Sequence, residues 1–109
     1  MKISLITVTF NSGGTLRDTI QSVLSQTYYD IEYIIVDGHS QDNTVDIIKE
    51  YEPLFDGKMR VLSEEDRGIY DAMNQGYALS SGDIVVCFND VFTENDVVRK
   101  MVEKVSSIN

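Results

Sequence analysis

The stretch "YIIVDGHSQDNT", residues Tyr33 to Thr44, decides the fold. Its apolar half is rich in β-branched residues and stops at Asp37, and a glycine and a run of small polar residues follow. A strand that is apolar on both faces is typical of a parallel sheet covered by helices on both sides. A carboxylate at the end of such a strand requires a structural or functional explanation, and the rest of the sequence indicates what it could contact.

The same order of apolar strand and amphipathic helix repeats along the chain. Apolar residues at helical spacing predict helices between the strand candidates, with glycine and small polar residues at the joints. We expect an α/β fold, with a mostly parallel sheet of about four strands flanked by helices. The expected strands are 3–9, 31–37, a short strand within 59–66, and 83–88. The expected helices are 15–26, one capped by Asp42 or Asn43, 68–80 with Tyr70, Met73 and Tyr77 in the core, and one from Thr93 with Asp96 in a capping-box position.

Composition limits the partners of the chain. With 109 residues, 42% of them hydrophobic, one domain with a packed core is expected over residues 1–109. Eighteen acidic against nine basic residues give a formal charge of −9, which argues against binding nucleic acid phosphates or anionic membranes. An anionic ligand would need a local device such as a helix N-terminus, a placed arginine or a metal ion. Cys87 is the only cysteine, and no apolar stretch reaches the roughly 18 residues that span a bilayer, so we expect a cytoplasmic protein.

In parallel sheets of this kind, ligands bind in a crevice beyond the carboxyl ends of the strands. The residues that follow the four expected strands therefore form one group, at 9–11, 37–38, 64–67 and 89–90. Asp37 thus lies at a strand end that faces a candidate binding crevice.

Three classes of parallel-sheet protein bind ligands in such a crevice, and each has its own sequence pattern. A dinucleotide-binding domain needs G-x-G-x-x-G where this chain reads TFNSGGTL. A phospho-accepting receiver domain needs paired acids there, and this chain has Phe10 and Asn11. A P-loop needs G-x-x-x-x-G-K-[ST], which the chain does not contain. None of the three patterns is met.

A different set of motifs runs through the chain in order. The first strand ends in Phe10-Asn11, a helix ends in S-x-x-x-Q-T-Y at 22–28, and V-D-G-x-S-x-D-x-T matches 36–44 without a mismatch. Over residues 3–98 the chain resembles the family-2 glycosyltransferases of the GT-A fold, a Rossmann-like fold of nucleotide-diphospho-sugar transferases. The resemblance implies transfer of a sugar from a nucleotide diphosphate donor, in our reading a UDP-sugar, to a hydroxyl of an acceptor glycan or lipid-linked sugar. It further suggests polysaccharide biosynthesis, at the inner face of a membrane through partners.

The resemblance also implies a donor site. Thr7 and Phe10 would lie near the nucleobase, with the ring of Phe10 as a wall. Asp37 would accept a hydrogen bond from the imide N–H of the base, which favours uracil or thymine over cytosine. Asp66 and Arg67 would lie near the ribose and diphosphate, where the predicted helix start at 68 offers free N–H groups to an anion. The implied nucleotide-sugar-binding residues are Thr7, Phe10, Asn11, Asp37, Asp66 and Arg67.

Simpler structural roles compete for the same residues. Asp37 could be only a strand-to-turn signal, as acidic and glycine residues often are. The ring of Phe10 could plug the edge of the sheet, and Arg67 could be a solvated surface charge. His39, in a polar turn, is expected to be exposed rather than catalytic.

The chain departs from the family pattern after the fourth strand. The short D-x-D-like motif of the family looks about two residues shorter here, where 88–92 reads FNDVF, so Asp90 alone takes the place of the metal ligand. A divalent ion such as Mn²⁺ or Mg²⁺ can be held by one or two carboxylates with phosphate oxygens and waters. The missing carboxylate is expected to weaken metal binding or abolish it.

The resemblance further implies an acceptor-binding half that carries the catalytic base. Residues 1–109 are therefore interpreted as a truncated donor-binding domain, and no residue is assigned as that base. Two functions stay open: the donor half of a glycosyltransferase, favoured by the intact 36–44 block, or a catalytically inactive nucleotide-binding or interaction module, favoured by the shortened acidic motif. Self-association through exposed apolar surface is also expected, because a short sheet leaves an edge or face uncovered.

Overall fold

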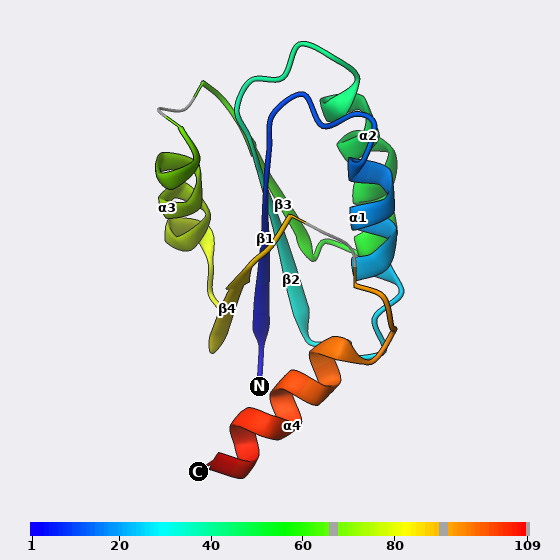
Figure 1. Cartoon of the computed structure of the whole chain (residues 1–109), viewed down its shortest axis with the longest axis vertical. Coiled ribbons are helices and arrows are strands. Elements are labelled where there is room, and N and C mark those ends of the chain that lie inside the picture. The colour runs from blue at the N-terminus through cyan, green and yellow to red at the C-terminus, as the bar shows by residue number, and fades with distance from the viewer. Residues whose placement is uncertain (66–67, 90–91, 109) are drawn as a thin grey trace.

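The computed structural model describes residues 1–65, 68–89 and 92–108, which form a parallel sheet with helices on both of its faces (Figure 1). Along the chain the elements are β1 (Ile3–Thr9), α1 (Leu16–Leu24), β2 (Ile31–Asp37), α2 (Thr44–Tyr51), the 3₁₀ helix η1 (Glu52–Phe55), β3 (Met59–Ser63), α3 (Ile69–Leu79), β4 (Ile84–Cys87) and α4 (Val97–Ile108). The strand order is β3-β2-β1-β4, and every neighbouring pair is parallel. The predicted α/β fold with four parallel strands is confirmed.

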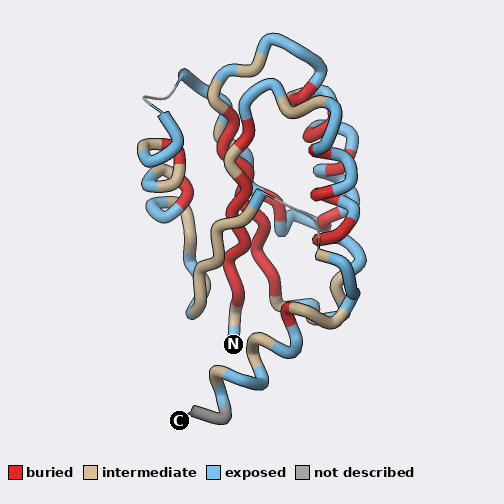
Figure 2. Tube along the Cα trace, in the orientation of Figure 1, coloured by how far each residue is buried: buried red, intermediate tan, exposed pale blue. Residues whose placement is uncertain are grey.

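The two central strands, β1 and β2, form the middle of the core (Figure 2). Every residue of β2 is buried, as the apolar run 33–36 predicts for a central strand, and the buried residues include the two carboxylates Glu32 and Asp37. Helices α1 and α2 cover one face of the sheet, and α3 covers the other (Figure 1). The larger apolar cluster lies on the α1 and α2 face, and a smaller one on the α3 face contains Ile6, Ile34, Val36 and Ala72.

Helix α3 lies very close to β1. A Cβ on Gly76 would stand 2.7 Å from Cγ2 of Ile6, so any larger residue here would force the buried side chain of Ile6 to shift. Within α3, Ala72 and Gly76 are the buried residues, whereas Tyr70 is 80% and Tyr77 50% exposed. The predicted core positions of the two tyrosines are therefore wrong. The helix packs through its small residues, and this close approach turns the large side chains toward solvent.

Helix α4 begins at Val97 rather than at Thr93. The capping-box prediction is wrong because the start of the helix is set by a tertiary contact. The side-chain Oε1 of Gln26 in the loop after α1 accepts a hydrogen bond from the backbone N–H of Val98 (3.1 Å). Asp96 instead contacts Lys100 within α4, 3.4 Å away. Among the described helices, none has both the length and the apolar character needed to cross a membrane.

Candidate functional site

A cleft of about 650 Å³ lies beyond the carboxyl ends of the strands. The strand order reverses between β1 and β4, and this switch point is where open parallel sheets bind ligands. Residues at all four strand ends and at the start of α3 line the cleft. Val8 and Thr9 end β1 and Phe10 follows it, Gly38, His39 and Gln41 follow β2, Glu65 follows β3, and Asn89 follows β4. Gly68 precedes α3, and Ile69 begins it. The expected crevice is therefore present at the expected end of the sheet.

Asp37 ends β2 and is completely buried. Its Oδ1 accepts hydrogen bonds from Oγ1 of Thr9 (2.8 Å) and Oγ of Ser40 (2.6 Å). Its Oδ2 accepts from the backbone N–H of Ser40 (2.9 Å) and from Oγ of Ser63 (2.9 Å). Burial alone would raise the pKa of Asp37, but the hydrogen bonds, first those from Ser40, outweigh it and hold the pKa below its usual range. The ionised carboxylate ties the ends of β1 and β3 to the loop after β2.

The loops that follow β1 and β2 are joined to each other above Asp37. The backbone N–H of Asn11 donates to Oγ of Ser40 (2.8 Å), and Oδ1 of Asn11 accepts from the backbone N–H of Gln41 (2.9 Å). Asn11 and His39 both have a left-handed backbone, with φ of 48° and 63°. Such conformations are uncommon outside glycine, and asparagine and histidine tolerate them better than most residues. The joined loops form one wall of the cleft.

A second set of contacts extends this junction to the start of α2. The backbone N–H of Ser12 donates to Oγ1 of Thr44 (2.8 Å), and that of Gly13 donates to Oδ2 of Asp42 (3.1 Å). Asp42 also accepts from the hydroxyl of Thr44, the first cause of the lowered pKa of Asp42, and from the backbone N–H of Thr44 (3.0 Å). Of the two predicted caps of α2, Asp42 therefore makes the side-chain contact, and Asn43 makes no capping bond. Most polar residues of the 36–44 motif organise loops.

The predicted site residues divide into three groups. Phe10 lines the cleft and is 63% exposed, and Asn11 lies in the joined loops beside it. Thr7 and Asp37 are buried below the lining residues; the hydroxyl of Thr7 is 2.8 Å from that of Tyr33, inside the core. Contact between Asp37 and a nucleobase stays a prediction, since it requires one of four hydrogen-bond donors to give way. Asp66, Arg67 and Asp90 lie outside the described residues.

The described residues supply no metal cluster. Within residues 1–65, 68–89 and 92–108, no three His, Cys, Asp or Glu side chains are placed to hold one ion. Oδ1 of Asn89 accepts from the backbone N–H of Val8 (3.1 Å), and Glu94 lies 3.5 Å from Lys100. The predicted Mn²⁺ or Mg²⁺ site therefore depends on Asp90.

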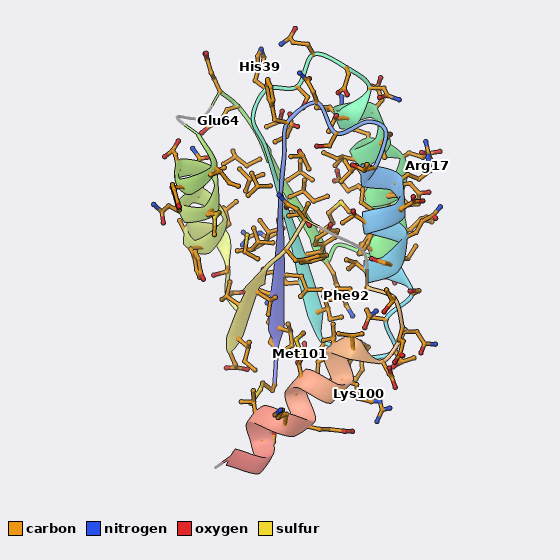
Figure 3. The ribbon with its side chains drawn as sticks, in the orientation of Figure 1. Arg17, His39, Glu64, Phe92, Lys100 and Met101 are labelled. Atoms are coloured by element: carbon orange, nitrogen blue, oxygen red, sulfur yellow. The ribbon has the colours of Figure 1, made fainter. Side chains whose placement is uncertain are left out.

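Several residues that line the cleft belong to no recognisable sequence motif. Gly68 has φ of 114°, a conformation that favours glycine, and it precedes α3. The N-terminal end of α3 therefore borders the cleft through Gly68 and Ile69, which is the anion-attracting feature expected for an acidic chain. His39, labelled in Figure 3, is exposed at the rim, as predicted. Only their place after strand ends pointed to Glu65 and Asn89, and the sequence analysis did not identify Gln41 as a cleft residue.

Comparison with known proteins gives a consistent family. The model of "Glycosyl transferase family 2" matches residues 4–109. An uncharacterized glycosyltransferase of Mycobacterium tuberculosis is 42% identical over 107 residues, which are 95% of this chain and 40% of that protein. The poly-beta-1,6-N-acetyl-D-glucosamine synthase of Staphylococcus epidermidis is 36% identical over 102 residues, which are 93% of this chain and 24% of the synthase. The chain thus spans less than half the length of these relatives.

Solved structures agree on the fold. S. aureus TarS 1-349 in complex with UDP-GlcNAc superposes with a TM-score of 0.88 at 20% identity, over 98% of this chain and 32% of that TarS chain. The mannosyltransferase PcManGT of Pyrobaculum calidifontis, in complex with GDP-Man and Mn²⁺, superposes with a TM-score of 0.83 at 22% identity, over 94% of this chain and 31% of that enzyme. At these identities the likeness shows a shared fold.

Proposed function

Because the chain belongs to glycosyl transferase family 2, whose GT-A fold it shares, we propose that it forms the donor-binding portion of a glycosyltransferase that uses a UDP-sugar. The observation that carries this proposal is the cleft beyond the strand ends, whose walls are held by the hydrogen bonds around Asp37. The acceptor is proposed to be a hydroxyl of a glycan or lipid-linked sugar, in line with the named activity of the staphylococcal relative. A cytoplasmic location stays a prediction.

Phe10 is proposed as the apolar wall against which the nucleobase stacks. It is the large exposed aromatic residue that both lines the cleft and follows β1 directly. Stacking a base on an aromatic ring stabilises binding by about 1–3 kcal/mol. The base would lie next to the joined loops, where His39 and Gln41 also line the cleft.

The diphosphate is proposed to lie at the other side of the cleft, toward the start of α3. The N-terminal end of a helix favours an anion through its dipole, and the start of α3 borders the cleft at Gly68 and Ile69. Arg67, next to this helix start in the sequence, is proposed to pair with the phosphates. This arrangement would let a chain of charge −9 bind an anionic ligand.

A divalent cation is proposed on Asp90, where it would neutralise the diphosphate leaving group. The proposal follows from the family motif and from the Mn²⁺ named with the related mannosyltransferase. One carboxylate with phosphate oxygens and waters is enough for such an ion, although fewer protein ligands mean weaker binding.

The test is calorimetric titration of UDP into the wild-type chain with and without Mn²⁺, beside Phe10→Ala. We expect UDP to bind, more tightly with Mn²⁺, and Phe10→Ala to weaken binding about tenfold, because 1.4 kcal/mol is lost with the stacking surface. Tyr29→Ala is the matched control, since Tyr29 is an 81% exposed aromatic residue that does not line the cleft.

Three other outcomes would contradict all or part of the proposed function. UDP binding that ignores Mn²⁺ but falls in Phe10→Ala would leave a nucleotide-binding module without a metal. Equal weakening of UDP binding by Phe10→Ala and Tyr29→Ala would show that UDP does not stack on Phe10 in the cleft. No UDP binding under either condition would overturn the donor-site proposal.

A further inference from the structure

The S-x-x-x-Q-T motif at the end of α1 takes no part in the cleft described above. Ser22 lies in the last turn of α1 and Gln26 follows the end of the helix, where its Nε2 donates to the backbone carbonyl of Ser22 (3.2 Å). Neither residue lines the cleft. Both contact the segment that follows β4, and residues 92–96 lie beside the C-terminal end of α1 (Figure 1).

The contacts between the two segments are specific hydrogen bonds. Oγ of Ser22, which is buried, accepts from the backbone N–H of Phe92 (3.1 Å). Nε2 of Gln26 donates to the backbone carbonyl of Glu94 (2.8 Å), while its Oε1 accepts from the backbone N–H of Val98 (3.1 Å). Both ends of one amide group thus hold backbone groups on either side of the start of α4. The next residue, Thr27, donates its backbone N–H to the carbonyl of Asn95 (2.7 Å).

The other end of this segment forms a wall of the cleft. Phe88 donates its backbone N–H to the carbonyl of Ile6 (2.9 Å), and Asn89 lines the cleft while its Oδ1 accepts from the backbone N–H of Val8 (3.1 Å). Phe92, labelled in Figure 3, packs on the ring of Phe88 with ring centroids 4.6 Å apart. Only two residues separate Asn89 from Phe92 in the sequence, so the chain can span at most about 11 Å between their Cα atoms. The ring contact with Phe88, the residue before Asn89, therefore links the position of Phe92 to that of Asn89.

We propose that Ser22 and Gln26 are positioning residues for the cleft: they hold the chain after β4 so that Asn89 stays at the cleft wall. In consequence, they act on donor binding without touching the donor, and this part of the inference rests on the proposed function. The motif would then connect the face of the sheet covered by α1 to the binding site beyond the strand ends.

The test compares Ser22→Ala and Gln26→Ala with the wild type by amide hydrogen exchange, by the NMR signals of the Asn89 side-chain amide, and by UDP titration. We expect at least tenfold faster exchange at Phe92 in Ser22→Ala and at Val98 in Gln26→Ala. We also expect faster exchange at Val8, shifted Asn89 signals and about fivefold weaker UDP binding in both variants. Circular dichroism at the titration temperature establishes that each variant is folded.

Two matched variants sharpen the comparison. Gln21→Ala removes another glutamine of α1, whose Nε2 donates to the hydroxyl of Tyr51 (2.7 Å) on the α2 side, and it should leave Val8, Asn89 and UDP binding unchanged. Ser22→Thr keeps the hydroxyl and should restore the wild-type Asn89 signals.

Faster exchange at Phe92 and Val98 with unchanged Val8 and Asn89 signals would overturn the proposal and leave Ser22 and Gln26 as anchors of α4 alone. If the wild-type chain does not bind UDP, the proposed function fails, while the response of Val8 and Asn89 still decides whether the positioning exists.

Discussion

Strand β2 carries two buried carboxylates, Glu32 near its start and Asp37 at its end, and their surroundings differ. Each accepts a hydrogen bond from a hydroxyl of the residue that pairs with it on β1, Ser4 for Glu32 (2.7 Å) and Thr9 for Asp37 (2.8 Å). Each also accepts a backbone N–H from a following turn, from Ser81 (3.0 Å) and Ser40 (2.9 Å) respectively. In both cases burial would raise the pKa, and the hydrogen bonds lower it overall.

The difference lies in the charges nearby. Lys2 and Arg60 lie 3.8 and 3.7 Å from Glu32, whereas no described basic residue forms an ion pair with Asp37. The end of the sheet at Glu32 is closed by the turn between α3 and β4, and the end at Asp37 opens into the cleft. Similar polar contacts thus join structural elements at one end and hold the walls of a binding site at the other.

The largest expected effect comes from Asp37→Ala. It would leave three hydroxyls and one backbone N–H without their acceptor in a buried site, and each lost bond to a charged group costs about 1.5–3 kcal/mol. We expect the free energy of unfolding to fall by about 3 kcal/mol or more and UDP binding to be lost. Urea unfolding and calorimetry measure the two effects. A well-folded Asp37→Ala that binds UDP normally would show that the carboxylate does not hold the cleft.

Gly82→Ala tests the closed end. A Cβ at Gly82 would stand 2.7 Å from the backbone N of Ser4 and 2.6 Å from its Oγ, and backbone atoms cannot move aside cheaply. We expect a loss of about 2 kcal/mol of stability, in the range of overpacking. Because the cleft lies at the other end, UDP affinity measured on the folded protein should stay within twofold of the wild type. A strong loss of UDP affinity would mean that the two ends are coupled.

The glycine and carboxylate contacts also show how far the sequence determines this site. The apolar runs predicted β1 and β2 to the residue, and the place of Asp37 after such a run pointed to the cleft. The sequence could not show that Thr9 and Ser63 bond to Asp37, because they meet it only through the register of three strands. The predicted burial of the α3 tyrosines and the predicted start of α4 were wrong for the same reason. The packing of Gly76 against Ile6 and the hydrogen bond between Gln26 and Val98 are long-range contacts that no local sequence pattern contains.

A smaller effect, and a pH dependence, is expected from Glu32→Gln. The folded-state pKa of Glu32 is lower than its ordinary value of 4.5, so the stabilisation is complete above pH 4.5 and is lost as the pH falls through the folded-state pKa. At pH 7 we expect Glu32→Gln to cost about 1–2 kcal/mol, since weaker neutral bonds replace charged ones. Urea unfolding should be measured from about pH 2 to about pH 7, a range that spans the pKa of a glutamate. The free energies of unfolding of the wild type and Glu32→Gln should converge at the acid end.

UDP titration at pH 7 completes this comparison, because Glu32→Gln should bind UDP like the wild type. A difference in stability that stays constant down to the lowest pH would show that ionisation of Glu32 is not what stabilises the closed end.

The smallest expected effect is that of Lys2→Met, which tests whether the charges near Glu32 matter at all. The side chain of Lys2 is 40% exposed and its Nζ is 3.8 Å from Glu32, so solvent weakens the attraction. Exposed pairs of this kind contribute about 0.2–1 kcal/mol. We expect a loss of about 0.5 kcal/mol in 0.1 M salt that shrinks in 1 M salt, where the screening length falls from about 10 Å to about 3 Å. A salt-independent loss above about 1 kcal/mol would mean that Glu32 depends on its cation, and that the two carboxylates of β2 are stabilised by different physics. A small, screened loss would mean that hydroxyl and backbone donors suffice at both ends, so that Asp37 needs no basic partner to stay ionised beside the cleft.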